Sequence, residues 1–146
     1  ARGASADFWG ADLALAARLG SGFTVSSTFS WTSKDLIPGD AGLSDIVFNA
    51  PKRSGSLSVA FHHPGSGVGV ELAGRAQSTF PVRSGEYRGT VGSYTVVDGA
   101  LSWRLRWLPG VTAGISATNL LDHRHQEFVG APVIGRLVTA RLRTEF

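Results

Sequence analysis

The sequence contains no cysteine among its 146 residues. This absence excludes a disulfide framework, thiol chemistry and a cysteine-ligated metal. The sequence also lacks any run of about 18 apolar residues, which excludes a transmembrane helix. A bilayer can still be crossed by strands of about 9–11 residues that close into a barrel, so a membrane protein built from strands remains open.

Clustered charge is also absent. The formal net charge is +3 and the arginines are scattered, without a basic run, so we expect no nucleic-acid partner. The chain begins at Ala1 with neither an initiator Met nor a signal sequence, and we therefore expect it to be an incomplete piece of a secreted protein.

Seven segments alternate with a period of two and are rich in β-branched and aromatic residues, which predicts strands. They are Trp9–Leu19, Phe23–Thr32, Ser56–His62, Val68–Phe80, Tyr94–Trp107, Val111–Leu120 and Leu137–Phe146. Short connections rich in Gly alternate with long ones along the chain. This asymmetry is typical of outer-membrane barrels, which have short periplasmic turns and longer extracellular loops.

Charged residues within these segments never interrupt the apolar alternation. They are Asp12, Arg18, Glu71, Arg75, Asp98, Arg104, Arg106, Arg141, Arg143 and Glu145. One face of each strand is therefore free of charge, as a face in contact with lipid must be, because a Lys or Arg at mid-bilayer costs about 2–4 kcal/mol. The opposite face is polar and suits a water-filled lumen.

Seven strands cannot close a wholly antiparallel barrel, because the first and the last would run in the same direction. Unpaired strand edges inside lipid cost several kcal/mol per backbone group. We therefore expect further strands from additional polypeptide. Two alternatives remain open: a complete eight-stranded barrel acting as an anchor or adhesin, with its extra strand near residues 43–48, and a soluble β-sandwich binding module.

The C-terminal third carries a series of short motifs. Asn119-Leu120-Leu121-Asp122 is followed by His125-Gln126-Glu127-Phe128, Gly130, the Gly135-Arg136 pair and a final strand that ends in an aromatic residue. Their order and spacing resemble the end of TonB-dependent outer-membrane receptors. Asn49-Ala50-Pro51-Lys52-Arg53 is similar to a segment that precedes a strand in the same family. Leu121 and His125 depart from the family pattern, which more often has Phe and Tyr there.

The resemblance implies that residues 1–146 are the C-terminal part of a receptor barrel, about seven meandering strands of a probable 22, without the N-terminal plug and the earlier strands. Such receptors import a scarce nutrient such as a ferric siderophore, cobalamin or a carbohydrate. The implied partners are outer-membrane lipid, the remaining strands and plug, the TonB complex through the missing N-terminal region, the barrel-assembly machinery and a small nutrient ligand. The implied location is the outer membrane of a Gram-negative bacterium.

Site residues follow from the same resemblance and from the strand faces. Phe146, with Leu142 and Ala140, resembles the assembly signal at the end of outer-membrane barrels. Structural motif positions are Asn119, Leu120, Asp122, Gly135 and Arg136. Candidate substrate contacts in the lumen or loops are Arg75, Arg104, Arg141, Arg143, His123 and His125, although pairing of the arginines with carboxylates is an alternative role.

No arrangement of residues supports catalysis, because the sequence has no Gly-x-Ser-x-Gly nucleophile elbow and its carboxylates are dispersed. We therefore predict that the chain is not an enzyme and needs no cofactor. His123, His125 and Glu127 lie close in sequence, but this spacing in a loop is unspecific, and we predict no metal site.

Overall fold

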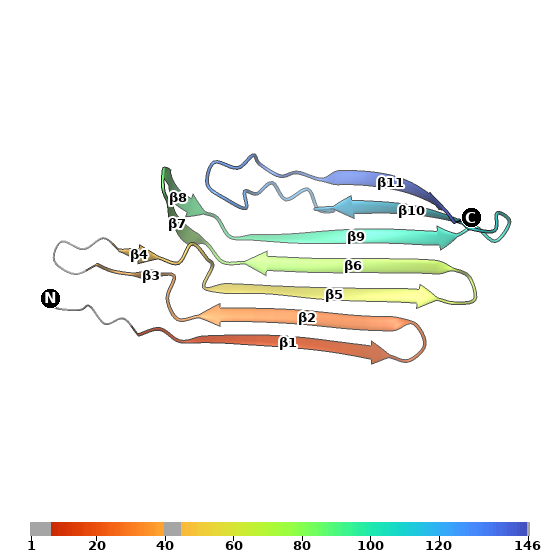
Figure 1. Ribbon diagram of the computed structural model, residues 1–146, viewed down its shortest axis with the longest axis horizontal. Helices are drawn as coiled ribbons and strands as arrows, with labels where there is room; N and C mark the ends of the chain where they lie inside the picture. Colours follow the sequence, from red (N-terminus) through yellow and green to blue (C-terminus); the bar gives the residue numbers. More distant parts are fainter. Residues whose placement is uncertain (1–6, 40–44, 146) are drawn as a thin grey trace.

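The computed structural model describes residues 7–39 and 45–145, and all regular structure in these ranges is β (Figure 1). No helix in the described ranges is long and apolar enough to cross a membrane. The strands are β1 (Gly10–Leu19), β2 (Phe23–Thr32), β3 (Leu36–Ile37), β4 (Ile46–Val47), β5 (Arg53–His63), β6 (Val68–Gln77), β7 (Phe80–Ser84), β8 (Tyr87–Val91), β9 (Tyr94–Arg104), β10 (Val111–Thr118) and β11 (Leu137–Thr144).

Seven long strands form one antiparallel sheet in the order β1-β2-β5-β6-β9-β10-β11. This is a simple meander, in which each long strand pairs with the next long strand along the chain. The predicted all-β meander of seven strands is confirmed. The sheet is open, with β1 and β11 at opposite edges (Figure 1). It has a short-turn end, where β1–β2, β5–β6 and β9–β10 connect, and a long-loop end on the other side.

Cross-strand register aligns the apolar positions into one continuous face. Val59 lies opposite Leu72, and Leu72 lies opposite Gly99 on the next strand. Leu13, Leu72, Leu101 and Leu142 are 56%, 50%, 48% and 68% exposed. These leucines are not packed together inside a core, as a water-soluble body would require.

Neither alternative architecture is found in the described ranges. No second sheet covers the apolar face, so the β-sandwich is wrong. No eighth strand joins the sheet either. Ile46 and Val47, in the segment considered for that strand, pair instead with Ile37 and Leu36 in a small hairpin, while residues 43 and 44 lie outside the described ranges.

Several strand boundaries differ from the sequence prediction, and β6 and β9 show why. β6 ends at Gln77, and Phe80 begins a separate strand, β7. β9 ends at Arg104, so Arg106 and Trp107 lie in a turn rather than in a spanning strand. The last cross-strand bond runs from Leu105 N to Val111 O (2.9 Å), and the turn itself is marked by the bond from Leu108 N to Leu105 O (3.1 Å), which an extended strand would not form.

The long connections contain structure of their own. β3 pairs with β4, and β7 pairs with β8, outside the main sheet. The predicted link 81–93 is therefore mostly hairpin. Phe80, Val82 and Val91 of this hairpin form a buried cluster, against which Val129 from a later loop packs. This cluster lies at the long-loop end and not beneath the sheet (Figure 1).

Candidate functional site at the long-loop end

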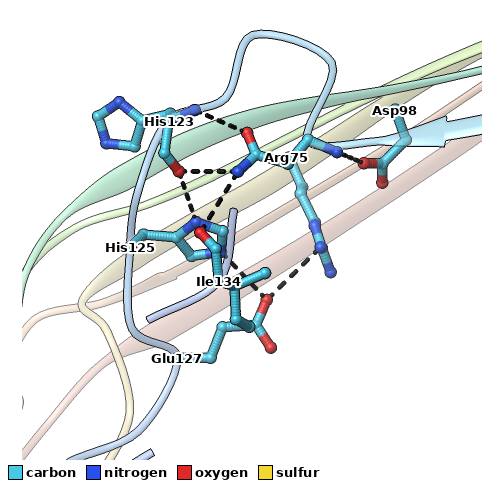
Figure 2. Close-up of polar contacts among 7 residues, drawn as sticks. Arg75, Asp98, His123, His125, Glu127 and Ile134 are labelled. Carbon is cyan, nitrogen blue, oxygen red and sulfur yellow. Dashed lines mark hydrogen bonds and ion pairs between the residues drawn. The ribbon is translucent and has the colours of Figure 1, made fainter. Parts of the chain in front are cut away.

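The β10–β11 loop, residues 119–136, folds back over the polar face of the sheet near β6 and β9. Val96 of β9 is fully buried, and Asn119 and His125 are 1% and 7% exposed. Figure 2 shows a connected set of polar contacts that includes Arg75, Asp98, His123, His125 and Glu127. The loop therefore has a specific fold against the sheet and forms part of its polar surface.

Asn119 organises the beginning of this loop. Its φ of 52° lies in the left-handed region, which Asn adopts more readily than most residues. Its Oδ1 accepts from His123 N (2.9 Å), its Nδ2 donates to His123 O (2.9 Å), and its backbone N donates to Asp98 Oδ1 (2.8 Å). A buried amide with these partners satisfies the polar groups that the turn exposes.

Asp122 connects the beginning of the loop to its end at Arg136. It also has a left-handed φ, 54°, and its Oδ1 accepts from Arg136 N at 2.9 Å. Arg136 Nη1 donates to Leu120 O at 3.4 Å, and Gly135 lies against the Asp122 carboxylate. The Asn-Leu-Leu-Asp and Gly-Arg motifs are thus brought together in space, 14 residues apart in the chain.

His125 and Glu127 connect the loop to the strand wall. The His125 ring packs on Tyr94 with centroids 4.3 Å apart, and its Nδ1 lies 2.9 Å from His123 O. Glu127 Oε1 lies 3.5 Å from both His125 Nε2 and Arg75 Nη2. His125 Nε2 is buried without hydrogen-bond geometry to any described partner, so its contact with Glu127 is electrostatic only when the ring is protonated.

A polar hollow of about 220 Å³ lies beside the Arg75–Glu127 ion pair on the same face. It is lined by Thr28, Ser56, Arg75, Gln77 and Tyr94, among others. Gln77 Nε2 is buried and has no hydrogen-bond partner in the described ranges. An unpaired amide donor and a guanidinium at a hollow are groups that can bind oxygen atoms of a ligand.

The other long loops join the same assembly. Gly89 and the buried cluster of the β7–β8 hairpin contact Val129, and Tyr87 packs edge-on against Phe128 at 5.7 Å. Asn49 has a left-handed φ of 55°, and its side-chain Oδ1 accepts a hydrogen bond from Arg83 N at 2.7 Å.

The β3–β4 hairpin is tied to this group by an ion pair between Asp45 and Arg83, with Oδ2 and Nη1 3.0 Å apart. Gly39 N donates to Asp45 Oδ1 at 2.9 Å. This backbone hydrogen bond, with the Arg83 charge, lowers the pKa of the Asp45 carboxyl below its usual value. All three long loops are therefore connected.

Three of the candidate lumen arginines lie together at the short-turn end instead. Thr112 of β10 is opposite both Arg104 of β9 and Arg143 of β11, and Arg141 is two residues further along β11. Arg143 pairs with Glu145 at 3.0 Å, but both side chains are mostly exposed, so the pair contributes little to stability. Arg104 and Arg141 form none of the ion pairs found in the described ranges.

The remaining predicted positions are placed as follows. Leu142 and Ala140 project from β11 onto the apolar face, whereas Phe146 lies outside the described residues. His123 is exposed, but His125 is buried and not accessible to a solvent-borne ligand in this conformation. No group of three or more His, Cys, Asp or Glu side chains suited to a metal ion occurs in the described part of the chain.

Sequence reasoning did not nominate three residues that hold this site: Tyr94, Asn49 and Gln77. The sequence shows Tyr94 only as an aromatic residue at the start of a predicted strand. Its ring packs on His125, which lies 31 residues further along the chain. Asn49 precedes Ala50-Pro51, and an Asn before such a segment is a local signal for a left-handed residue. For Gln77 the sequence carries no signal.

Comparisons with known proteins were made against families, curated sequences and solved structures. The TonB dependent receptor-like, beta-barrel family matches residues 1–120. The crystal structure of the siderophore receptor PiuA from Acinetobacter baumannii matches with a TM-score of 0.71 and 13% identity, over 94% of this chain and 21% of that chain. No curated protein sequence matches.

The family match ends before the last strand. The open seven-stranded sheet spans about a fifth of the length of the solved receptor. The single-layered sheet, the difference between its two faces and the matched residues are all consistent with part of a receptor β-barrel. This chain belongs to the TonB dependent receptor-like β-barrel family.

Proposed function

We propose that this chain is part of an outer-membrane receptor that imports a scarce nutrient with energy supplied through TonB. The observation that carries the proposal is the exposed apolar face running across all seven strands, which fits lipid, opposite a polar face that fits an aqueous lumen. Arg53, at the long-loop end of β5, places a charge at the edge of the apolar face. Proteins of this family are transporters and not enzymes. The rest of the barrel, 22 strands in all, and the plug would be supplied by additional polypeptide.

The orientation follows from the connections. With the short turns at the periplasmic side, the three connected long loops lie outside the cell and cover the mouth of the lumen. The hollow beside Arg75 and Gln77 is then a position for substrate on its way into the lumen. The lining offers the guanidinium of Arg75, which Glu127 also contacts, together with an amide and hydroxyl groups, and these donors suit an oxygen-rich nutrient such as a ferric siderophore.

The exposed arginines at the short-turn end would face the plug or an anionic substrate. Phe146, with Leu142 and Ala140, would serve as the signal for the barrel-assembly machinery. Deletion of Phe146 from the full receptor should lower the amount inserted in the outer membrane, measured by heat-modifiable migration of membrane fractions. Unchanged insertion would refute this role.

Transport is tested with the full-length receptor in cells that lack their own copy. Uptake of a labelled ferric siderophore, of cobalamin and of an oligosaccharide should be compared with and without a functional TonB complex. We expect uptake of the siderophore class that disappears without TonB. Uptake that continues unchanged without TonB, or no receptor-dependent uptake of any nutrient, would overturn the proposal.

A variant in the hollow tests whether the substrate contacts this site, and a control variant outside it tests for a general effect on folding. Gln77→Ala should raise the concentration needed for half-maximal uptake, because it removes an unpaired amide donor. Ser58→Ala, on the same polar face outside the hollow, is the control. Equal uptake by both variants would place the substrate elsewhere.

A further inference from the structure

A depression lies on the apolar face of the sheet, where no nutrient would reach it. It is a groove of about 460 Å³ whose lining includes Phe29, Arg53, Gly55, Leu57, Gly74 and Thr95. These positions share the face of the exposed leucines, because alternate residues of β2, β5 and β6 point to the same side. The groove and the polar hollow lie back to back on the two faces of the single layer, and they share lining residues, among them Ser54, Gly55 and Gln77.

Small residues in register create the groove. Gly55 lies opposite Phe29 on β2 and opposite Ala76 on β6, and Gly74 lies opposite Leu57 on β5. Phe29 and Leu57 stand as side walls, 48% and 53% exposed, while the two glycines contribute no side chain between them. A Cβ placed on Gly74 would meet only Leu57 O at 4.0 Å, so the space above it is open.

Charge is present at one end of the groove only. Arg53, the first residue of β5, is exposed and lies opposite Trp31 at the long-loop end of the sheet. Lys52 precedes it and is 46% exposed, with its Nζ 3.3 Å from Asp35. A cation beside Trp at the end of an apolar groove is an arrangement that suits the headgroup level of a membrane.

We propose that this groove binds one acyl chain of lipopolysaccharide, with Arg53 contacting a phosphate of the same molecule. The inference rests on the proposed orientation, which places the long-loop end in the outer leaflet, where lipopolysaccharide is the anionic amphiphile. The apolar walls fit a saturated chain, and the guanidinium fits a phosphate at the chain's polar end.

The site can be tested in the full-length receptor purified from outer membranes in mild detergent. Gly74→Leu fills the groove from a position where a Cβ meets only Leu57 O, and Arg53→Gln removes the cation. Matched controls are Ala17→Leu on the apolar face of β1 and Arg88→Gln on the β8 hairpin, both outside the groove. Heat-modifiable migration verifies that each variant is folded.

The readout is the lipopolysaccharide retained per receptor, measured by mass spectrometry of the extracted lipid A. We expect about a fivefold loss for Arg53→Gln, the effect of one basic residue near an anionic membrane surface. We expect at least as large a loss for Gly74→Leu, and wild-type retention for both controls. Wild-type retention in both groove variants would overturn the proposal.

Two other outcomes also overturn it: phospholipid retained at the groove in place of lipopolysaccharide, and receptor dimers that dissociate on Gly74→Leu. Nutrient uptake measured on the same variants separates this inference from the proposed function. Normal uptake with unchanged lipid retention refutes only the lipid site. Absent uptake in the wild type and in both controls refutes the transport proposal alone.

Discussion

Asn119 supports the β10–β11 loop through both its backbone angle and its side chain. The left-handed φ of 52° turns the chain out of β10, and the buried amide bonds to His123 on both sides of the turn. Asp122, three residues later, also has a left-handed φ, and its side chain accepts a hydrogen bond from Arg136 N. At the scale of single residues, short polar side chains that tolerate φ > 0 therefore determine where the loop turns.

Asn119→Ala should loosen this loop locally. The variant removes the side-chain hydrogen bonds to His123 N and O, each of which contributes about 0.5–1.5 kcal/mol. Amide hydrogen exchange of residues 120–136 in the full receptor should become faster. Arg124→Ala, an exposed residue in the same loop, is the control, and equal exchange in both variants would contradict the role of Asn119.

At the scale of elements, the short turns determine the register of the sheet and the long loops act as one unit. Gly22 has a φ of 109°, and a Cβ there would overlap the backbone carbonyl of His62. The β7–β8 hairpin and the β10–β11 loop share one buried apolar cluster. The structure is thus determined by turn geometry at the short-turn end of the strands and by loop packing at the long-loop end.

Gly22→Ala should impair formation of the β1–β2–β5 part of the sheet, because a side chain at this φ is strained and also collides with β5. The fraction of folded receptor, measured by heat-modifiable migration, should fall. Gly20→Asn is the matched control, since Gly20 has a φ of 60° that Asn tolerates and open space around its Cβ position. A Gly22→Ala receptor that folds as well as the control would contradict this account.

Val129→Ala should uncouple the β7–β8 hairpin from the β10–β11 loop. Val129 packs against Phe80, Val82 and Val91, and truncation of a partly buried Val removes apolar contact worth about 1 kcal/mol. Spin labels at Glu86 and Arg124 should then report a broader distance distribution. Val133→Ala, 55% exposed in the same loop, should leave the distribution unchanged, and identical distributions in the two variants would oppose the coupling.

At the scale of the whole molecule, one curved layer separates two environments. Every second residue faces the apolar side, and nothing in the described ranges covers it. The two faces therefore fit lipid on one side and an enclosed polar space on the other. The family of the chain agrees with this division.

Leu72→Arg should destabilise the full receptor in lipid vesicles by about 2–4 kcal/mol, because Leu72 lies in the middle of β6 on the apolar face. Ala73→Arg, one residue later on the polar face and opposite Asp98, should have a much smaller effect. Guanidinium titration of vesicle-inserted receptor measures both. Equal destabilisation by the two variants would mean that the faces have been assigned to the wrong environments.

The sequence by itself determined the seven strands, their meander and the environment of each face. This was possible because period-two alternation is a local signal and a meander pairs only strands that are neighbours in the chain. It misplaced the end of β9 because Leu105 and Trp107 continue the alternation beyond the residue where the backbone turns. Alternation reports a side chain's polarity, not the hydrogen bonds of its backbone.

Only the tertiary structure decided how the long loops fold and what they bury. Arg83 bonds Asp45 across 38 residues, and His125 packs on Tyr94 across 31, contacts that no local pattern encodes. The groove at Gly74 likewise appears only when register brings Gly55, Phe29 and Leu57 beside it. Strand faces follow from neighbouring residues, whereas loops and grooves depend on which distant residues the completed sheet brings together.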